Sequence, residues 1–158
     1  MSENLIDITI TNKDAVDYLT ATLSQIDRDR AVKSGLKKGG EVLKRGGMMR
    51  LKSRMKAVGT GNLLKSFIVR VKRSKPGVLT GFRQGKDGGN HSHLVDLGTI
   101  SRMQKSKNRK KGYRGGSSGV MPANHFWSDT KDLDYRDALH EVKTGIEKFV
   151  ERVNNKSV

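Results

Sequence analysis

The sequence has no cysteine, few aromatic residues and no long hydrophobic run. Without cysteine, the chain cannot form a disulfide framework, use a thiol nucleophile or bind a metal through cysteine. No stretch approaches the roughly 18 apolar residues that a membrane span requires, and the acidic first ten residues do not resemble a signal peptide. We therefore expect a soluble protein that is assembled in the cytosol and has no membrane partner.

Apolar residues are also scarce, at 34% of the 158 residues, with aromatic residues at 5%. A chain of this length is the size of one domain and can bury on the order of 70% of its unfolded surface. We expect a single domain over residues 1–158. A highly charged chain with so few apolar residues for its core favours extra burial between subunits, so we keep homo-oligomerisation as a hypothesis.

Acidic residues are nearly missing from the middle of the chain. Residues 30–114 contain 24 Lys and Arg but only three acids, Glu41, Asp87 and Asp96, which gives this segment a charge of +21. The flanking segments hold 8 basic and 13 acidic residues, so the formal net charge of the whole chain is +16. The central segment must therefore meet something anionic or lie where charge repulsion is tolerated.

The N-terminal part shows three periodic segments. Residues 5–10 alternate in the pattern of a half-buried strand. Asn12 is placed to cap a helix that runs through Leu23. A long helix is predicted from Asp27 to about Val58, because one stripe of apolar residues and glycines recurs at spacings of three and four. That stripe consists of Val32, Leu36, Gly40, Leu43, Gly47, Leu51, Met55 and Val58.

Glycines inside this long helix require an explanation, because each weakens a helix interior by about 1 kcal/mol relative to alanine. Gly39, Gly40, Gly46 and Gly47 leave two interpretations open. Either another element packs closely against the Gly40 and Gly47 side, or the helix breaks near Gly46 and Gly47. We favour one long helix with a kink permitted at that point.

Three further strands are expected after the long helix. Residues 62–73 alternate in the pattern of a strand, Pro76 and Gly77 form a turn, and residues 78–83 return as an antiparallel partner. Residues 93–97 (HLVDL) are interpreted as a third strand.

The C-terminal part contains a long basic loop and a helix. Residues 98–119 are almost free of apolar side chains, and a loop of this length is usually functional or disordered. We expect it to be flexible in the isolated protein. Residues 120–126 return to order, and an amphipathic helix is predicted from Asp129 to Val153. The apolar face of this helix consists of Tyr135, Leu139, Val142, Ile146, Phe149 and Val153.

Evidence for catalysis is weak. His91 and His93 would share one side of a strand, and Asp96 or His125 could complete a metal site, but a solvated loop edge explains the same pair. Ser117 and Ser118 have no identifiable base. The acids at the start of the last helix, Asp129, Asp132, Asp134 and Asp137, suit the helix dipole. We expect no enzyme, metal or cofactor; a metal-dependent nuclease using the histidines ranks as a minor alternative.

The basic segment favours two kinds of partner. Lys and Arg on a helix and a basic loop are typical of phosphate-backbone binding. A solvated helix face with a loop that docks on acidic proteins explains the same composition. Tyr113 is the one aromatic residue in the loop, which argues against base stacking on single strands. Composition alone leaves nucleic-acid binding and protein docking about equal.

Three segments in order resemble a known family. They are TGNLLKS at 60–66, HLVDLGT at 93–99 and MPANHF at 121–126. The order is similar to that of the tail-component family of long-tailed phages typified by the tenth gene product of phage Hong Kong 97. That family's pattern is a helix, a TG-x-L-x-x-S segment, an (E/D)-x-GT segment, a variable loop, an MPA-x-x-F segment and a C-terminal helix. The resemblance covers about residues 13–153.

The resemblance implies an α+β fold in which a long N-terminal helix and a C-terminal amphipathic helix pack on a small antiparallel sheet, with a long basic loop. It implies a structural virion protein of the neck, which joins head to tail as a homo-oligomeric ring around the DNA passage and assembles in the host bacterial cytoplasm. Implied partners are a portal or head-completion adaptor, a tail tube or tail terminator protein, and phage DNA in the lumen.

Two sets of residues follow from these interpretations. The motif positions, which we interpret as architectural, are Thr60, Gly61, Asn62, Leu63, Ser66, Asp96, Gly98, Thr99, Met121, Pro122, Ala123 and Phe126. The loop residues expected to contact a neighbouring subunit, an acidic partner ring or DNA are Arg102, Lys105, Lys107, Arg109, Lys110, Lys111 and Arg114. The alternative function is that of a basic protein that binds DNA or RNA without sequence preference.

Overall fold

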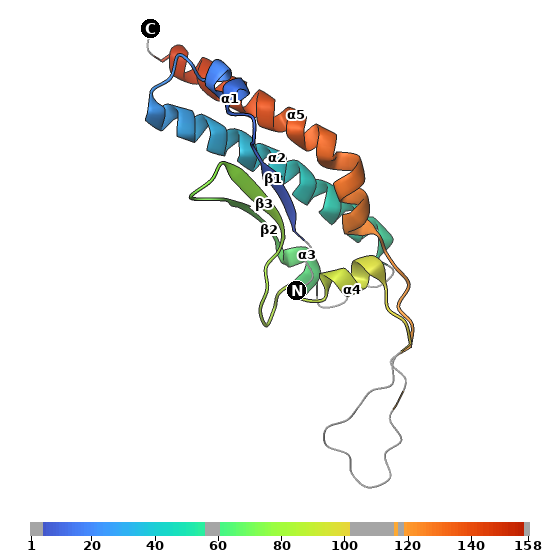
Figure 1. The fold of residues 1–158 in the computed structure, drawn as a ribbon. Coiled ribbons are helices and arrows are strands. Elements are labelled where there is room, and N and C mark those ends of the chain that lie inside the picture. The colour runs from blue at the N-terminus through green and yellow to red at the C-terminus, as the bar shows by residue number, and fades with distance from the viewer. Residues whose placement is uncertain (1–4, 56–60, 102–115, 117–118, 157–158) are drawn as a thin grey trace.

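The computed structural model describes residues 5–55, 61–101, 116 and 119–156 and has an α+β fold. Two long helices, α2 (Gln25–Arg54) and α5 (Phe126–Asn154), lie side by side, and α2 also packs against a small sheet (Figure 1). The helix α2 is therefore the central layer between α5 and the sheet. None of the helices in these ranges is long and apolar enough to cross a membrane.

The sheet has three antiparallel strands, β1 (Ile6–Thr9), β2 (Phe67–Val71) and β3 (Gly77–Phe82), in the order β1-β3-β2. Ile8 lies opposite Val78, and Val69 lies opposite Thr80. The predicted first strand and the predicted hairpin are confirmed. The alternation of β1 is clear in the structure, since Ile6 and Ile8 are buried while Asp7 and Thr9 are exposed.

The predicted strand at residues 93–97 is wrong, because the structure has a helix, α4 (Ser92–Leu97), in its place. The backbone N–H groups of Leu94 and Val95 both donate to the carbonyl of His91. Five residues are too few for periodicity to separate a buried strand from a helical turn. The predicted strand over residues 62–73 also starts too early, since a single helical turn, α3 (Asn62–Lys65), precedes β2.

The predicted helices exist with shifted ends. Asn12 caps α1 (Lys13–Leu19) by accepting from the Ala15 backbone N–H, but this helix stops before Leu23. Ser24 caps α2, which therefore starts two residues earlier than predicted. At the other end α2 stops at Arg54, and the predicted end near Val58 falls outside the described residues. The last helix starts at Phe126 instead of Asp129.

Close packing explains the glycines of α2, which runs as one helix through Gly46 and Gly47. A Cβ atom built on Gly40 would lie 2.6 Å from Val69 of β2, and one on Gly47 would lie 2.7 Å from Trp127. The same helix carries a second set of contacts with α5, where a Cβ on Gly35 would lie 2.5 Å from the backbone oxygen of Val142. Both neighbours of α2 therefore approach its backbone directly.

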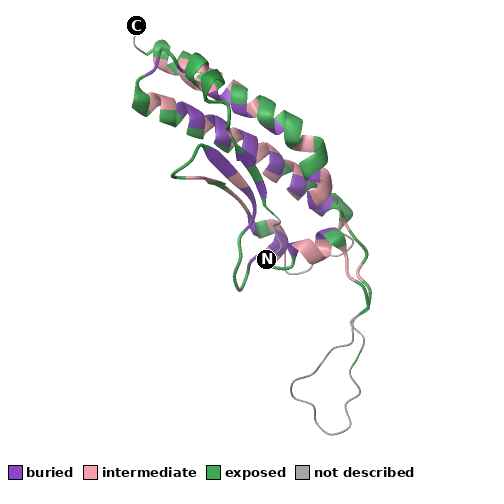
Figure 2. Ribbon diagram, in the orientation of Figure 1, coloured by how far each residue is buried: buried purple, intermediate pink, exposed green. Residues whose placement is uncertain are grey.

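The core has an aliphatic part between the long helices and an aromatic part at one end, and Figure 2 shows the buried residues along α2 and the sheet. The aromatic part contains Phe67, Phe82, Phe126 and Trp127, whose ring centroids are 4.5 to 6.2 Å apart in the contacting pairs. Tilted and edge-on ring pairs of this kind add about 0.5–1.5 kcal/mol each beyond their area burial.

The buried face of α5 differs in part from the predicted face. Val142 and Ile146 are buried, as predicted, but Tyr135 and Leu139 are 37% and 42% exposed. The face that contacts α2 is instead completed by Ala138 and by small or polar residues, because the two backbones come too close for larger side chains. Hydrophobicity alone could not reveal this, since it ranks a tyrosine or leucine above a glycine.

Candidate functional site

The second and third motif segments meet at the start of α5, where Asp96 caps the helix from a distant part of the chain. The Asp96 carboxylate accepts hydrogen bonds from the Trp127 backbone N–H at 2.6 Å, the Ser128 backbone N–H at 3.2 Å and the Ser128 hydroxyl at 2.5 Å. The residue that directly precedes the helix, His125, makes no side-chain cap and has a positive φ of 54°. Asp96 is 2% exposed, so it is a buried cap.

Backbone contacts join the same two segments. The N–H groups of Asn124 and His125 donate to the carbonyl of Asp96. Thr99 and Met121 form an antiparallel bridge in which each donates its backbone N–H to the other's carbonyl, at 2.8 and 3.2 Å. Gly98 has a φ of 75°, and a Cβ there would lie 2.7 Å from the backbone of Ala123. Gly98 therefore provides both an unusual conformation and the space for the second segment.

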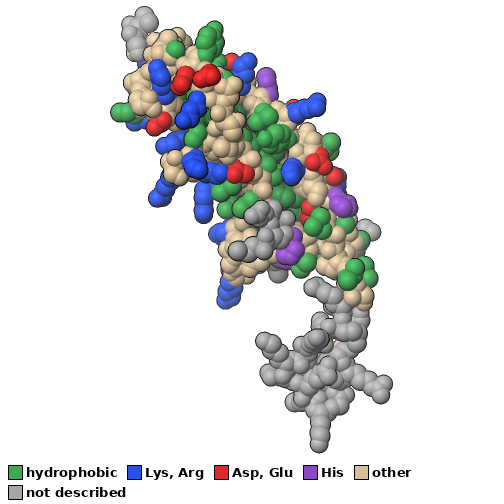
Figure 3. Space-filling model, viewed as in Figure 1, with side chains coloured by type: hydrophobic (Ala, Val, Ile, Leu, Met, Phe, Trp, Pro, Cys, Tyr) green, Lys and Arg blue, Asp and Glu red, His purple; other side chains and the backbone are tan. Residues whose placement is uncertain are grey.

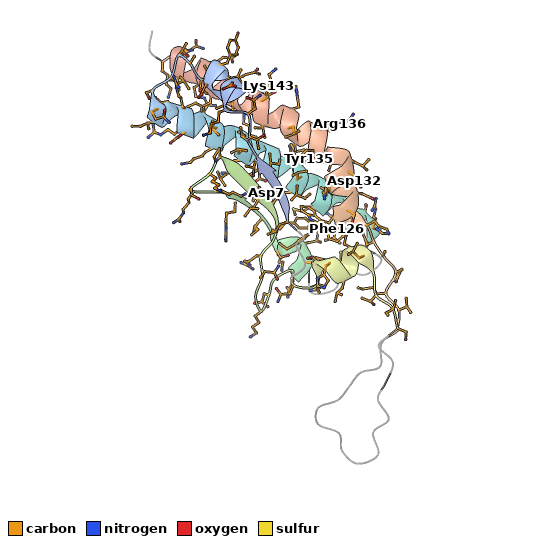
Figure 4. All side chains as sticks on the ribbon, in the orientation of Figure 1. Asp7, Phe126, Asp132, Tyr135, Arg136 and Lys143 are labelled. Atoms are coloured by element: carbon orange, nitrogen blue, oxygen red, sulfur yellow. The ribbon has the colours of Figure 1, made fainter. Side chains whose placement is uncertain are left out.

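The first motif segment supports the aromatic part of the core. Gly61 has a φ of 71° and precedes α3, Leu63 is buried, and the buried Ser66 hydroxyl donates to the Leu63 carbonyl at 2.7 Å. The Ser66 carbonyl accepts from Arg83 beside β3. Figure 4 labels Phe126 at this end of the molecule, where α3, α4 and the start of α5 converge.

The other motif positions lie beside these contacts or outside the described residues. Pro122 and Ala123 are exposed, and Asn62 is the first residue of α3. Thr60 lies outside the described residues, as do all seven basic loop residues, Arg102, Lys105, Lys107, Arg109, Lys110, Lys111 and Arg114. What the structure describes is the base of this loop, which the Thr99–Met121 bridge closes.

The proposed histidine cluster does not form a metal site in the described part of the chain. His91 and His93 lie at the start of α4, where residues two apart point to different sides of the helix, and not on one side of a strand. Both carboxylate oxygens of Asp96 accept hydrogen bonds from the start of α5. Among the described residues, no group of three His, Asp or Glu side chains is arranged to hold a metal ion.

Ion pairs fix the same end of the two long helices. Arg50 of α2 donates to both carboxylate oxygens of Asp134 of α5, at 2.6 and 2.7 Å, and to the Thr130 hydroxyl at 3.0 Å. The hydrogen bonds to the Asp134 carboxylate raise the pKa of the Arg50 guanidinium above its ordinary value, although burial opposes the shift. Arg54 and Asp129 form a second pair at 2.7 Å. Two of the four acids predicted to serve the helix dipole, Asp129 and Asp134, thus also bind α2.

Two apolar patches are exposed at different places on the surface. The first, here called the groove patch, lies between β1, α1 and α5 and is lined by residues that include Ile10, Val16, Leu19, Tyr18 and Leu139. Tyr18 is 84% exposed. The second, here called the loop-base patch, consists of Leu97, Ile100 and Val120, all more than 60% exposed. The Thr99–Met121 bridge sets Ile100 beside Val120.

A cationic groove of about 530 Å³ lies between the first half of α2 and the end of β2. Figure 3 shows Lys and Arg side chains gathered on this side of the molecule, over the start of α2 and the hairpin. The sequence predicted basic residues on α2, but it did not predict that the hairpin lies next to them. The basic residues that line the groove are Arg30, Lys33, Lys37, Lys72 and Arg73.

No protein-family model, no curated protein and no solved structure matches this chain.

Proposed function

We propose that this protein is a structural, non-enzymatic component of the neck of a long-tailed phage virion. Copies of the chain form a ring around the DNA passage, between a portal or head-completion adaptor and a tail tube or tail terminator protein. The resemblance in three ordered segments supports this proposal. The contacts among those segments add support, because Asp96, Gly98, Thr99 and Met121 build one junction at the base of the basic loop.

The observation that carries the ring proposal is the presence of two separate exposed apolar patches. A ring requires a heterologous contact, in which one surface of a subunit binds a different surface of its neighbour. The groove patch and the loop-base patch are two separate surfaces of this kind. The helix α1, which lines the first, and the end of α4, next to the second, lie toward opposite ends of the elongated molecule (Figure 1). Contiguous exposed apolar residues of this kind mark interaction sites in soluble proteins.

Electron microscopy and sedimentation velocity of the purified protein test this proposal. We expect rings for the wild-type chain and single subunits for a variant with Ile100→Asp and Val120→Asp in the loop-base patch. The control variant, Ser74→Asp with Gln84→Asp, adds the same charge at exposed positions outside both patches. Two results together would contradict the proposal: the purified wild-type protein stays monomeric at high concentration, and the parent particle has no matching ring at its neck.

A second candidate function is sequence-independent binding of DNA or RNA by the single subunit. The formal net charge of +16 and the exposed Lys and Arg side chains along α2 favour it. The test is the affinity for a short DNA duplex as a function of salt concentration. Tight binding by a monomer with a steep salt dependence supports this function, and the absence of binding near 50 mM salt excludes it.

A further inference from the structure

We infer that the cationic groove between α2 and β2 is a binding site for the phosphate backbone of a nucleic-acid duplex. This inference rests on the second candidate function and not on ring assembly, since one chain supplies every residue of the groove. It assigns that function to a particular surface, separate from the basic loop that the sequence analysis put forward.

The charge of the groove is of one sign. Its lining contains five basic side chains, one serine, one valine and no acid. Two of the basic residues have carboxylate partners at the rim, since Arg30 pairs with Asp27 at 3.4 Å and Lys72 pairs with Asp7 at 2.6 Å. No ion pair within 4 Å is found for Lys33, Lys37 or Arg73 among the described residues, and all three are exposed.

The spacing of these residues suits a row of phosphates. Arg30, Lys33 and Lys37 follow one another at intervals of three and four on one side of α2, so they extend over about 10 Å of the helix. Each strand of a DNA duplex carries a phosphate about every 3.4 Å along the axis, so the row spans about three phosphates. Arg73 faces them from the end of the hairpin, and the Ser34 hydroxyl adds a neutral donor of the kind that contacts phosphate oxygens.

The composition of the groove favours nucleic acid over an acidic protein. Protein interfaces are depleted in lysine and enriched in aromatic residues, whereas this lining has three lysines and Val71 as its one apolar side chain. The lining also has no aromatic ring on which an unpaired base could stack, which favours a duplex over a single strand. The remaining feature, a set of exposed cations, recognises phosphate charge without reading sequence.

The test compares two variants that lose the same charge. The groove variant carries Lys33→Ala, Lys37→Ala and Arg73→Ala, and the control variant carries Lys131→Ala, Arg136→Ala and Lys148→Ala at exposed positions of α5. Fluorescence anisotropy measures the affinity of each for a labelled duplex of mixed sequence over a range of salt concentrations. Circular dichroism confirms that each variant is folded, and a third variant with Lys33→Arg and Lys37→Arg keeps the charge.

We expect the groove variant to bind roughly tenfold or more weakly near 0.1 M salt, with a salt slope reduced by about 2.7, because three phosphate contacts are lost. The control and the charge-conserving variant should stay close to wild type. If wild type binds but the two alanine variants weaken equally, the groove assignment is wrong while the second candidate function stands. If wild type does not bind a duplex, both are wrong. If the groove variant loses self-association but keeps duplex binding, the groove is a subunit interface and the inference fails.

Discussion

Replacing Asp96 with alanine should destabilise the protein more than any other single loss of an acidic side chain in the described part of the chain. The carboxylate satisfies two backbone N–H groups and one hydroxyl at the start of α5. Loss of a helix cap alone costs about 0.5–2 kcal/mol. A buried donor left without an acceptor costs about 1–3 kcal/mol more, and the Trp127 N–H would be such a donor.

Together these terms give a loss of about 3 kcal/mol in the free energy of unfolding for Asp96→Ala. For a domain of this size, such a loss lowers the melting temperature by roughly 6–12 °C. Asp96→Asn should lose less, about 1–2 kcal/mol, because one carbonyl oxygen still accepts from Trp127 while the charge is removed. The N-cap residue offers no substitute acceptor, since the His125 side chain makes no cap hydrogen bond to this helix.

Urea denaturation followed by tryptophan fluorescence measures this prediction directly. Trp127 is the single tryptophan of the chain, is 4% exposed and donates its backbone N–H to Asp96. Asp137→Ala is the matched control, because it removes an exposed acid from the same helix. The capping argument is refuted if Asp96→Ala stays within about 0.5 kcal/mol of wild type, which is the usual range for a surface substitution.

Two further predictions concern the contact between the long helices. Gly35→Ala should destabilise the protein by about 1–3 kcal/mol despite the better helix propensity of alanine, because the new Cβ meets the Val142 backbone oxygen; thermal unfolding beside the exposed-site control Arg45→Ala checks this. Arg50→Ala should cost about 2 kcal/mol, and a double-mutant cycle with Asp134→Ala should give a coupling of about 1–2 kcal/mol. A coupling near zero would show that the bidentate pair contributes no stability.

The parts of the fold that the sequence predicts are those with a sustained period. The stripe along residues 27–58 and the alternation in residues 5–10 predicted α2 and β1, because each repeats over enough positions to separate a helix from a strand. The hairpin was predictable because Pro76 and Gly77 mark its turn. In contrast, α4 has only six residues, which is less than two helical turns, and the segment His93 to Leu97 was too short for its pattern to separate a strand from a helix.

Contacts between distant residues explain why the junction could not be derived from the sequence by pattern alone. Asp96 caps a helix that starts 30 positions later, and Arg50 binds an acid 84 positions away. Two local features of the sequence are consistent with this junction. Gly98 lies two residues after Asp96, and no Ser, Thr, Asp or Asn stands immediately before Phe126, so the helix start lacks a cap of its own.

The two proposed functions share one electrostatic constraint. Subunits that each carry a formal charge of +16 repel one another when they are brought into a ring, and the charged segment cannot be neutralised by the few acids within it. A polyanion bound in the cationic groove removes part of that repulsion. The two binding equilibria are linked: if bound phosphate raises the affinity between subunits by some factor, assembly raises the affinity for phosphate by the same factor. A ring of this protein around a nucleic-acid passage would therefore be more stable with the duplex present than without it, and high salt would weaken that difference because it screens both the repulsion and the attraction.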